Sequence, residues 1–122
     1  MIVVDASVIL EILSQTPIGI EFGSALDGRS LHAPHLIDLE VASALRQWEI
    51  AGVANPENAA TMLRAFQAMR IQRHPHDALL PAFWALRHNL TAYDAAHLAL
   101  ARSLDAELVT MDGGLRRMAR RR

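Results

Sequence analysis

Short apolar runs alternate along the chain with longer stretches whose apolar residues recur at helical spacing. Ile2-Val3-Val4 is a β-branched run that ends in Asp5, and this pattern is typical of a buried strand. Further short strands are predicted at residues 30–33, 71–73 and 107–110. Helices are predicted at residues 7–13, 17–26, 36–50, from 56 onward, 77–88 and 92–103, with a short helix after Asp112-Gly113.

The helical stripes indicate which side chains form the core. On the helix at residues 36–50, the apolar residues that share one face are Ile37, Val41, Ala44, Leu45 and Trp48. On the helix that begins at Pro56, they are Ala59, Met62, Leu63, Phe66 and Met69. The aromatic residues Trp48, Phe66, Phe83 and Trp84 also fall at helical spacings, so we expect them in the core and not as platforms for stacked bases.

The order of these elements favours one α/β domain over residues 1–122. Strands that alternate with helices form a parallel sheet covered on both faces. In such sheets, ligands bind beyond the carboxyl ends of the strands. Asp5 ends the first strand and Asp112 closely follows the last, so both are predicted where this class of fold places its chemistry.

The charges are unevenly distributed. All 12 basic residues are arginine, against 13 acidic residues, and the formal net charge is −1. The arginine-rich C-terminal segment, residues 113–122, holds five arginines and no acid, a charge of +5, which leaves −6 on residues 1–112. This segment could contact nucleic acid or an acidic partner, and a solvated terminus explains it equally well.

Several classes of protein are excluded by what the chain lacks. Without cysteine it has no disulfide, thiolate metal site or cysteine nucleophile. Without lysine it does not fit receiver domains, haloacid-dehalogenase-type phosphatases or Gly-Lys phosphate-binding loops, and no glycine cluster follows the first strand. We find neither a signal peptide nor an apolar run long enough for a membrane span, so a cytoplasmic protein without a membrane partner is expected.

Two of the candidate acids have ordinary local explanations. Asp5 precedes a predicted helix start, where aspartate commonly caps backbone N–H groups, and capping and function are about evenly balanced for it. Glu40 lies at the border of an apolar stripe, where a glutamate is common on any amphipathic helix.

The other two acids can also be explained locally. Asp94 follows Thr91 by three residues in a capping-box pattern. Asp112-Gly113 after a strand is a common turn signal. No single acid is therefore convincing, and the interest lies in their joint placement.

If these four acids converge, they need a cation between them. Two carboxylates ~4 Å apart repel by ~4 kcal/mol at an effective dielectric constant near 20. A site made of oxygen ligands selects Mg²⁺ or Mn²⁺ over zinc or copper. Such an ion polarises a phosphodiester and lowers the pKa of a bound water, and a second ion could stabilise the leaving oxygen.

Other polar residues near these acids have two interpretations each. Ser7 and Thr110 could orient the acids through their hydroxyls or serve as local caps. His97, one helical turn after Asp94, could reach the site or be a partly buried histidine. His74-Pro75-His76 is better explained as a polar loop than as a metal-binding pair.

Four segments together resemble the PIN-domain family, most closely the VapC toxins of bacterial toxin–antitoxin pairs. The segments are Ile2-Val-Val-Asp5-Ala-Ser7, Ala33-Pro34 with Leu39-Glu40-Val41, Leu90-Thr-Ala-Tyr93-Asp94-Ala-Ala-His97-Leu-Ala-Leu-Ala101, and Leu108-Val-Thr110-Met-Asp112-Gly-Gly-Leu115. The resemblance runs in order over nearly the whole chain, and the four segments together are specific although each alone is weak.

The resemblance implies a three-layer α/β/α sandwich around a parallel sheet of four or five short strands. It implies a Mg²⁺ or Mn²⁺ site in which Asp5 and Asp94 are the firmest ligands, Asp112 completes the set, and Glu40 positions water or a second ion. It also implies an endoribonuclease that cuts structured RNA such as tRNA or ribosomal RNA, forms a homodimer and is inhibited by a VapB-like antitoxin.

The sequence departs from the family pattern in two places. Members commonly continue past the last acid through a helix into an edge strand, whereas this chain ends in the arginine-rich segment, so a four-stranded sheet is expected. The absence of lysine would leave all contacts with the RNA backbone to arginine.

These departures keep a second hypothesis open, a PIN-like module that binds RNA or a partner without efficient catalysis. A flap-type DNA nuclease is less favoured because the chain has no large insertion.

Overall fold

The computed structural model describes residues 1–121 and contains one parallel β-sheet. Its four strands are β1 (Ile2–Val4), β2 (Leu31–Pro34), β3 (Ile71–His74) and β4 (Glu107–Val109). They are ordered β3-β2-β1-β4. Strand β1 pairs with β4 in the register Ile2↔Glu107 and with β2 in the register Ile2↔Leu31. The predicted parallel sheet of short strands is confirmed, with four strands among the described residues.

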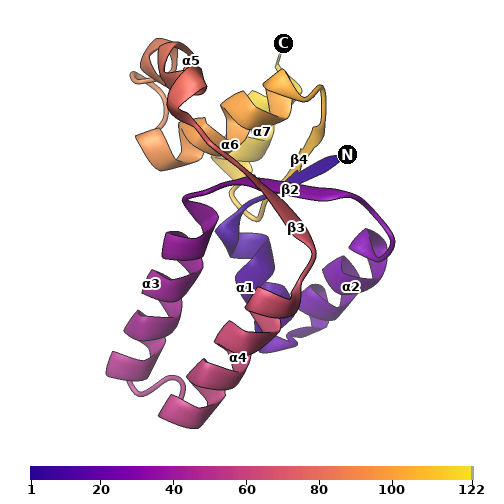
Figure 1. The fold of residues 1–122 in the computed structure, drawn as a ribbon, viewed down its shortest axis with the longest axis vertical. Helices are drawn as coiled ribbons and strands as arrows, with labels where there is room; N and C mark the ends of the chain where they lie inside the picture. Colours follow the sequence, from indigo (N-terminus) through magenta and orange to yellow (C-terminus); the bar gives the residue numbers. More distant parts are fainter. Residues whose placement is uncertain (122) are drawn as a thin grey trace.

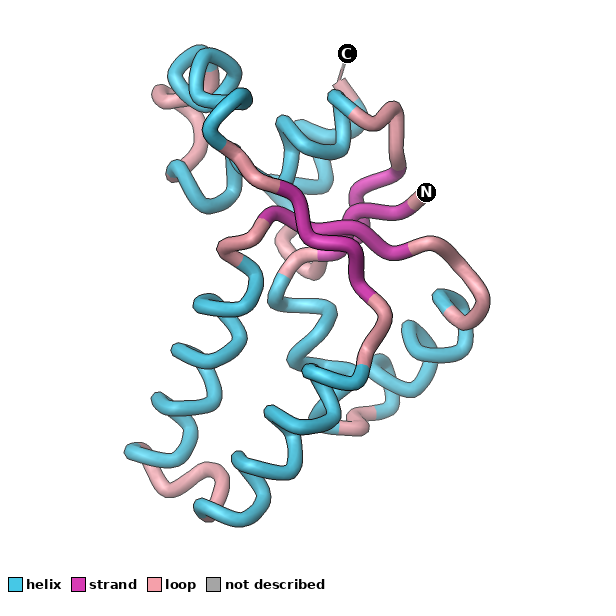
Figure 2. The backbone as a smooth tube through the Cα atoms, in the orientation of Figure 1, coloured by secondary structure: helices cyan, strands magenta, loops and turns pink. Residues whose placement is uncertain are grey.

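Helices cover both faces of this sheet (Figure 1). On one side lie α1 (Ala6–Ser14), α2 (Pro17–Leu26), α3 (Ile37–Ile50) and α4 (Pro56–Ala68). On the other side lie a 3₁₀ turn, η1 (Asp77–Leu79), and the helices α5 (Leu80–Ala85), α6 (Ala92–Ser103) and α7 (Gly113–Arg120). Figure 2 shows the same three layers, with the strands between the two groups of helices. None of these helices, all within residues 1–121, is long and apolar enough to cross a bilayer.

The alternation of side chains along β1 divides the core in two. Successive residues of a strand point to opposite faces, so Ile2 and Val4 pack against α1, α3 and α4, whereas Val3 packs against α6. Helix α6 is buried along most of its length because it crosses β1, β2 and β4. This burial on both faces explains why β1 is apolar at every position.

The order of the strands places a switch point between β1 and β4. The chain moves outward from β1 to β2 and β3, then crosses to the other face and returns to pair β4 with the free edge of β1. Ligands of open α/β sheets bind at such reversals, beyond the carboxyl ends of the strands. Asp5 and Asp112 follow the two strands that flank this point.

The region between β3 and α6 differs from the prediction. The helix expected at 77–88 is divided into η1 and the short helix α5, which ends at Ala85. Pro81 lacks an N–H group and occupies the first turn of α5, which is the position where proline starts a helix. The strand before it, β3, is one residue longer than expected, because it includes His74. The Nε2 of His74 lies 2.8 Å from Nδ1 of His32 on the neighbouring strand β2.

The expectation of a core position was wrong for Leu63, which is 44% exposed, and for Trp84. The Trp84 side chain is 68% exposed, and the guanidinium of Arg87 lies 4.6 Å from the ring centroid. Helix α5 has only six residues, and none of them is buried, so helical spacing alone does not place Trp84 in the core. By contrast, Phe66 is buried and Trp48 packs against the same core, while Phe83 is half-buried with its ring 6.1 Å from that of His76.

Helices α1 and α2 approach so closely at Gly19 that no larger residue fits. A Cβ at this position would lie 1.9 Å from the carbonyl oxygen of Glu11. We therefore expect Gly19→Ala to lower the free energy of unfolding by about 1–3 kcal/mol in urea titrations. Gly23→Ala, on the same helix, is the control, because nothing lies within 4 Å of its added methyl group and alanine favours the helix by about 0.5–1 kcal/mol. Equal effects at both positions would contradict this packing.

Candidate active site

Asp5 is a buried carboxylate held by three donors at the end of β1. It is 7% exposed, and its Oδ1 accepts hydrogen bonds from the Ser7 hydroxyl at 2.6 Å and the Val8 backbone N–H at 3.3 Å. Its Oδ2 accepts a short hydrogen bond from the hydroxyl of Thr110. The cap predicted from sequence is therefore present, and the same carboxylate is also bound to β4. A buried carboxylate needs such donors, since an unpaired one would carry a large desolvation penalty.

Thr110 and Ser7 join the carboxyl ends of β1 and β4. Thr110 is 2% exposed, and its hydroxyl, while donating to Asp5, accepts the backbone N–H of Asp112 at 3.0 Å. The Ser7 hydroxyl likewise accepts the N–H of Met111 at 3.0 Å. Both hydroxyls thus bind Asp5 and a backbone N–H of the turn that carries Asp112, and they fix Asp5 relative to that turn.

Asp112 starts helix α7. Its Oδ1 accepts the N–H of Leu115 at 2.8 Å, which is ordinary N-capping, and the residue is exposed. Its second oxygen accepts no hydrogen bond from residues 1–121. The turn explanation and a ligand role are thus compatible, because only one carboxylate oxygen is used to cap the helix.

Glu40 is oriented by a buried histidine from across the fold. The Nε2 of His97, on α6, lies 2.8 Å from Oε1 of Glu40, on α3. His97 is 1% exposed, and its Nδ1 has no hydrogen-bond partner among residues 1–121. A histidine that donates from Nε2 to a carboxylate carries no proton on Nδ1 when neutral. His97 thus reaches the group of acids, through Glu40.

Asp94 lies on the first turn of α6 with acids around it. Its backbone N–H is capped by the Thr91 hydroxyl at 3.3 Å, as the capping-box pattern predicted. Burial raises the pKa of its carboxyl above the ordinary value, the charges of Asp112, Asp5 and Glu40 raise it further, and His97 lowers it. The four predicted acids are therefore near enough for three of them to act electrostatically on the fourth. Asp94 and Asp112 also line one cavity of about 420 Å³.

The chemistry of this group of acids fits a hard divalent cation. The donors are carboxylate oxygens, which Mg²⁺ and Mn²⁺ prefer, and within residues 1–121 no arginine forms an ion pair with any of the four acids. As the side chains are placed in residues 1–121, no group of three or more histidine, aspartate or glutamate residues is close enough together to hold a metal ion. Asp5 is fixed by its donors, whereas the Asp94 carboxylate accepts no hydrogen bond from residues 1–121. The role of each acid as a metal ligand thus stays a prediction.

Two further residues of this cavity were not among those predicted from sequence. Arg117 and Arg121 line it together with Asp94 and Asp112. The spacing of four residues between these two arginines was the available signal, because residues at i and i+4 share a helix face.

Comparison with known proteins gives consistent matches over this chain. A family model described as "PIN domain" matches residues 2–121. Ribonuclease VapC9 of Mycobacterium tuberculosis is 39% identical over 115 residues, covering 92% of this chain and 86% of its own length. Ribonuclease VapC12 of the same species is 33% identical and covers 94% of this chain and 89% of its own length. The crystal structure of PAE2754 from Pyrobaculum aerophilum aligns with a TM-score of 0.68 at 26% identity, covering 93% of this chain and 76% of that one.

The two hydrogen bonds of the Thr110 hydroxyl can be tested by removing it. Thr110→Val keeps the shape of the side chain and leaves Oδ2 of Asp5 and the Asp112 N–H each without its hydrogen bond to Thr110, so we expect the free energy of unfolding to fall by about 1–3 kcal/mol. Thr110→Ser is the matched control, because it retains the hydroxyl. If chemical denaturation finds valine as stable as wild type, these hydrogen bonds do not hold the site together.

The raised pKa of Asp94 predicts how stability depends on pH. The native protein binds this proton more tightly than the unfolded chain, so the contribution of Asp94 to stability is lost as pH rises from the ordinary value of 3.8 through the native pKa. In EDTA, we expect Asp94→Asn to raise the thermal midpoint at neutral pH but not near pH 3. Exposed Asp27, replaced by asparagine, serves as the control. A lower midpoint for Asp94→Asn at neutral pH would show that the ionised carboxylate is stabilised in the fold.

Proposed function

The chain belongs to the PIN-domain family, and from this premise we propose that it is a Mg²⁺- or Mn²⁺-dependent endoribonuclease, the toxin of a VapBC-type toxin–antitoxin pair that acts in the cytoplasm. The relatives named ribonuclease VapC match over nearly the whole chain, which supports a nuclease. The observation that carries the metal dependence is the grouping of Asp94 with Asp112, Asp5 and Glu40. Burial and then the charges of these acids raise the pKa of the Asp94 carboxyl, and a divalent cation stabilises such a concentration of acids.

The proposed roles follow from how tightly each acid is held. Asp5, with three donors on its carboxylate, is the fixed ligand, and Thr110 and Ser7 keep it in place. Asp94 and Asp112 each have a carboxylate oxygen free of hydrogen bonds from residues 1–121, so they complete the ligand set by small rotations. When bound, the divalent ion supplies Lewis-acid polarisation of the scissile phosphate and offsets its charge.

Glu40 is proposed to hold the attacking water. Its Oε1 is taken by His97 at 2.8 Å, and its side chain remains partly exposed. The other oxygen is therefore available to accept a hydrogen bond from water and to take up its proton as the oxygen bonds to phosphorus and the P–O bond of the leaving nucleotide breaks. His97 acts through Glu40 and is a positioning residue.

The substrate and partners are inferred from the relatives. We propose structured RNA, tRNA or ribosomal RNA, as the substrate, a VapB-like antitoxin as the inhibitor and a homodimer as the assembly. A second candidate, a module that binds RNA or a partner with little catalysis, is favoured by the open arrangement of the acids, of which no three form a cage within residues 1–121.

Cleavage of a panel of tRNAs and ribosomal RNA fragments tests the proposal. We expect discrete cuts with Mg²⁺ or Mn²⁺, none with EDTA, and a loss of at least about 100-fold in rate for Asp5→Asn and Asp94→Asn, because removing even an outer partner of a metal ligand typically costs 10–100-fold. Glu49→Gln, an exposed acid at the far end of α3, should cut like wild type.

Two outcomes would contradict the proposed activity. Cuts that persist in Asp94→Asn would point to another site or a contaminating nuclease. Tight binding of intact RNA, unaffected by EDTA, would favour the binding module.

A further inference from the structure

The arginines of α7 separate onto two faces of the helix. Arg116 and Arg120, one helical turn apart, line a cavity of about 530 Å³ beside β4. Arg117, on the helix, and Arg121, which directly follows it, line the cavity that contains Asp94 and Asp112. The segment that the sequence shows as one block of positive charge thus divides into two pairs with different surroundings.

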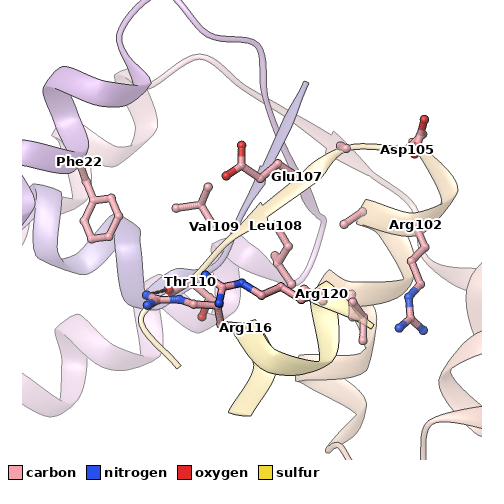
Figure 3. Close-up of a pocket in the computed structure, with 13 residues that line it drawn as sticks. Phe22, Arg102, Asp105, Glu107, Leu108, Val109, Thr110, Arg116 and Arg120 are labelled. Carbon is pink, nitrogen blue, oxygen red and sulfur yellow. Dashed lines mark hydrogen bonds between the residues drawn. The ribbon is translucent and has the colours of Figure 1, made fainter. Parts of the chain in front are cut away.

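The first face has a structural use. The Nη2 of Arg116 donates to the carbonyl oxygen of Thr110 at 2.7 Å, which fastens α7 to the end of β4. Figure 3 shows Arg116 and Arg120 extending from α7 toward Thr110, with Arg102 at the opposite end of the strand. Arg102 donates to the carbonyl oxygens of Met118 and Arg121, at 3.2 and 2.9 Å, and so caps the end of α7.

The second face has no such partner. The guanidinium of Arg117 lies over the glycines that begin α7, since a Cβ at Gly113 would come within 3.4 Å of its Nη1 and one at Gly114 within 3.7 Å of its Nη2. The same Cβ at Gly114 would lie 3.3 Å from Oδ1 of Asp112. Arg117 therefore lies close to this acid, yet it forms no hydrogen bond or ion pair with any side chain of residues 1–121.

We propose that Arg117 and Arg121 each bind a backbone phosphate of the RNA next to the acids, and that the contact of Arg117 carries substrate affinity. The proposal rests on the nuclease function above and assigns the contact that brings a polyanion to an acidic cleft. A guanidinium offers paired N–H donors that match two phosphate oxygens. Its charge offsets the repulsion between the RNA and the four carboxylates, none of which forms an ion pair with an arginine of residues 1–121.

The contact is a phosphate contact and not base recognition. The described side chains that line this cavity are arginine, aspartate, asparagine, leucine and methionine, with no aromatic ring on which a base could stack. A guanidinium that reads only the backbone adds affinity for any sequence. We therefore expect the choice of cut site to be unchanged when Arg117 is replaced.

The salt dependence of RNA binding distinguishes this contact from a general effect of the basic segment. A labelled single-stranded RNA is titrated with protein in EDTA, so that binding is measured without cleavage, over a series of KCl concentrations. Each lost phosphate contact reduces the slope of log K against log salt by about 0.7 for single strands. We expect that reduction for Arg117→Gln, about twice as much when Arg121→Gln is added, and no reduction for Arg120→Gln on the other face.

Steady-state cleavage with Mn²⁺ gives a second, independent measurement. For Arg117→Gln we expect KM to rise roughly tenfold, the size of one lost charged hydrogen-bonding group, while kcat stays within about twofold. Arg117→Lys keeps the charge, so it should retain the salt slope and recover part of KM. This recovery would not occur if Arg117 only supported the fold.

The outcomes separate this proposal from the proposed function. Equal slopes for Arg117→Gln and Arg120→Gln, or an unchanged KM in an active Arg117→Gln enzyme, would overturn the phosphate contact and leave the nuclease intact. The wild-type protein could cut no RNA while the salt slope of RNA binding still falls for Arg117→Gln and not for Arg120→Gln. In that case the phosphate contact stands and the nuclease function fails.

Discussion

The hydrogen bonds on the Asp5 carboxylate connect the candidate site to the sheet. Asp5 directly follows β1, its donor Thr110 directly follows β4, and the two strands come from opposite ends of the chain. A carboxylate that is 7% exposed is tolerated only with donors of this kind. Correct docking of β4 beside β1 is therefore a condition both for burying Asp5 and for positioning Asp112, so the fold and the site are assembled by the same pairing.

The concentration of acids that this assembly produces works against stability. Asp94 has a raised pKa because it is partly buried among Asp112, Asp5 and Glu40. The chain offsets part of the repulsion locally, with His97 on Glu40 and with N–H and hydroxyl donors on Asp5 and Asp112. Functional sites often retain unfavourable groups of this kind, since the activity needs them.

Much of the fold could be predicted from sequence because the apolar pattern has different periods in strands and helices. The buried run Ile2-Val3-Val4 and the stripes of α3 and α4 are properties of local sequence, and so are the caps at Asp5, Thr91 and Asp112. The side chain of Trp84 was misplaced because helical spacing does not reveal what covers a short helix. The division of the predicted helix at residues 77–88 depends on Pro81.

The site itself was only partly accessible to such reasoning. The acids could be placed at strand ends and helix starts, but each had an ordinary local explanation. The pairing of His97 with Glu40 joins residues 57 positions apart and follows from how α6 crosses the sheet. Arg116 and Arg120 line one cavity, and Arg117 and Arg121 line another. The block of arginines in the sequence does not show this division, because it depends on how α7 packs against the rest of the fold.

The most direct test of the account is the position of Mn²⁺ in crystals of the wild-type protein, located by its anomalous scattering. The account predicts a peak among the carboxylates of Asp5, Asp94 and Asp112, at the coordination distances of roughly 2.0–2.6 Å that hard cations adopt with oxygen ligands. The absence of a peak there at saturating Mn²⁺, or a peak only elsewhere, such as at the His32–His74 pair, would contradict it.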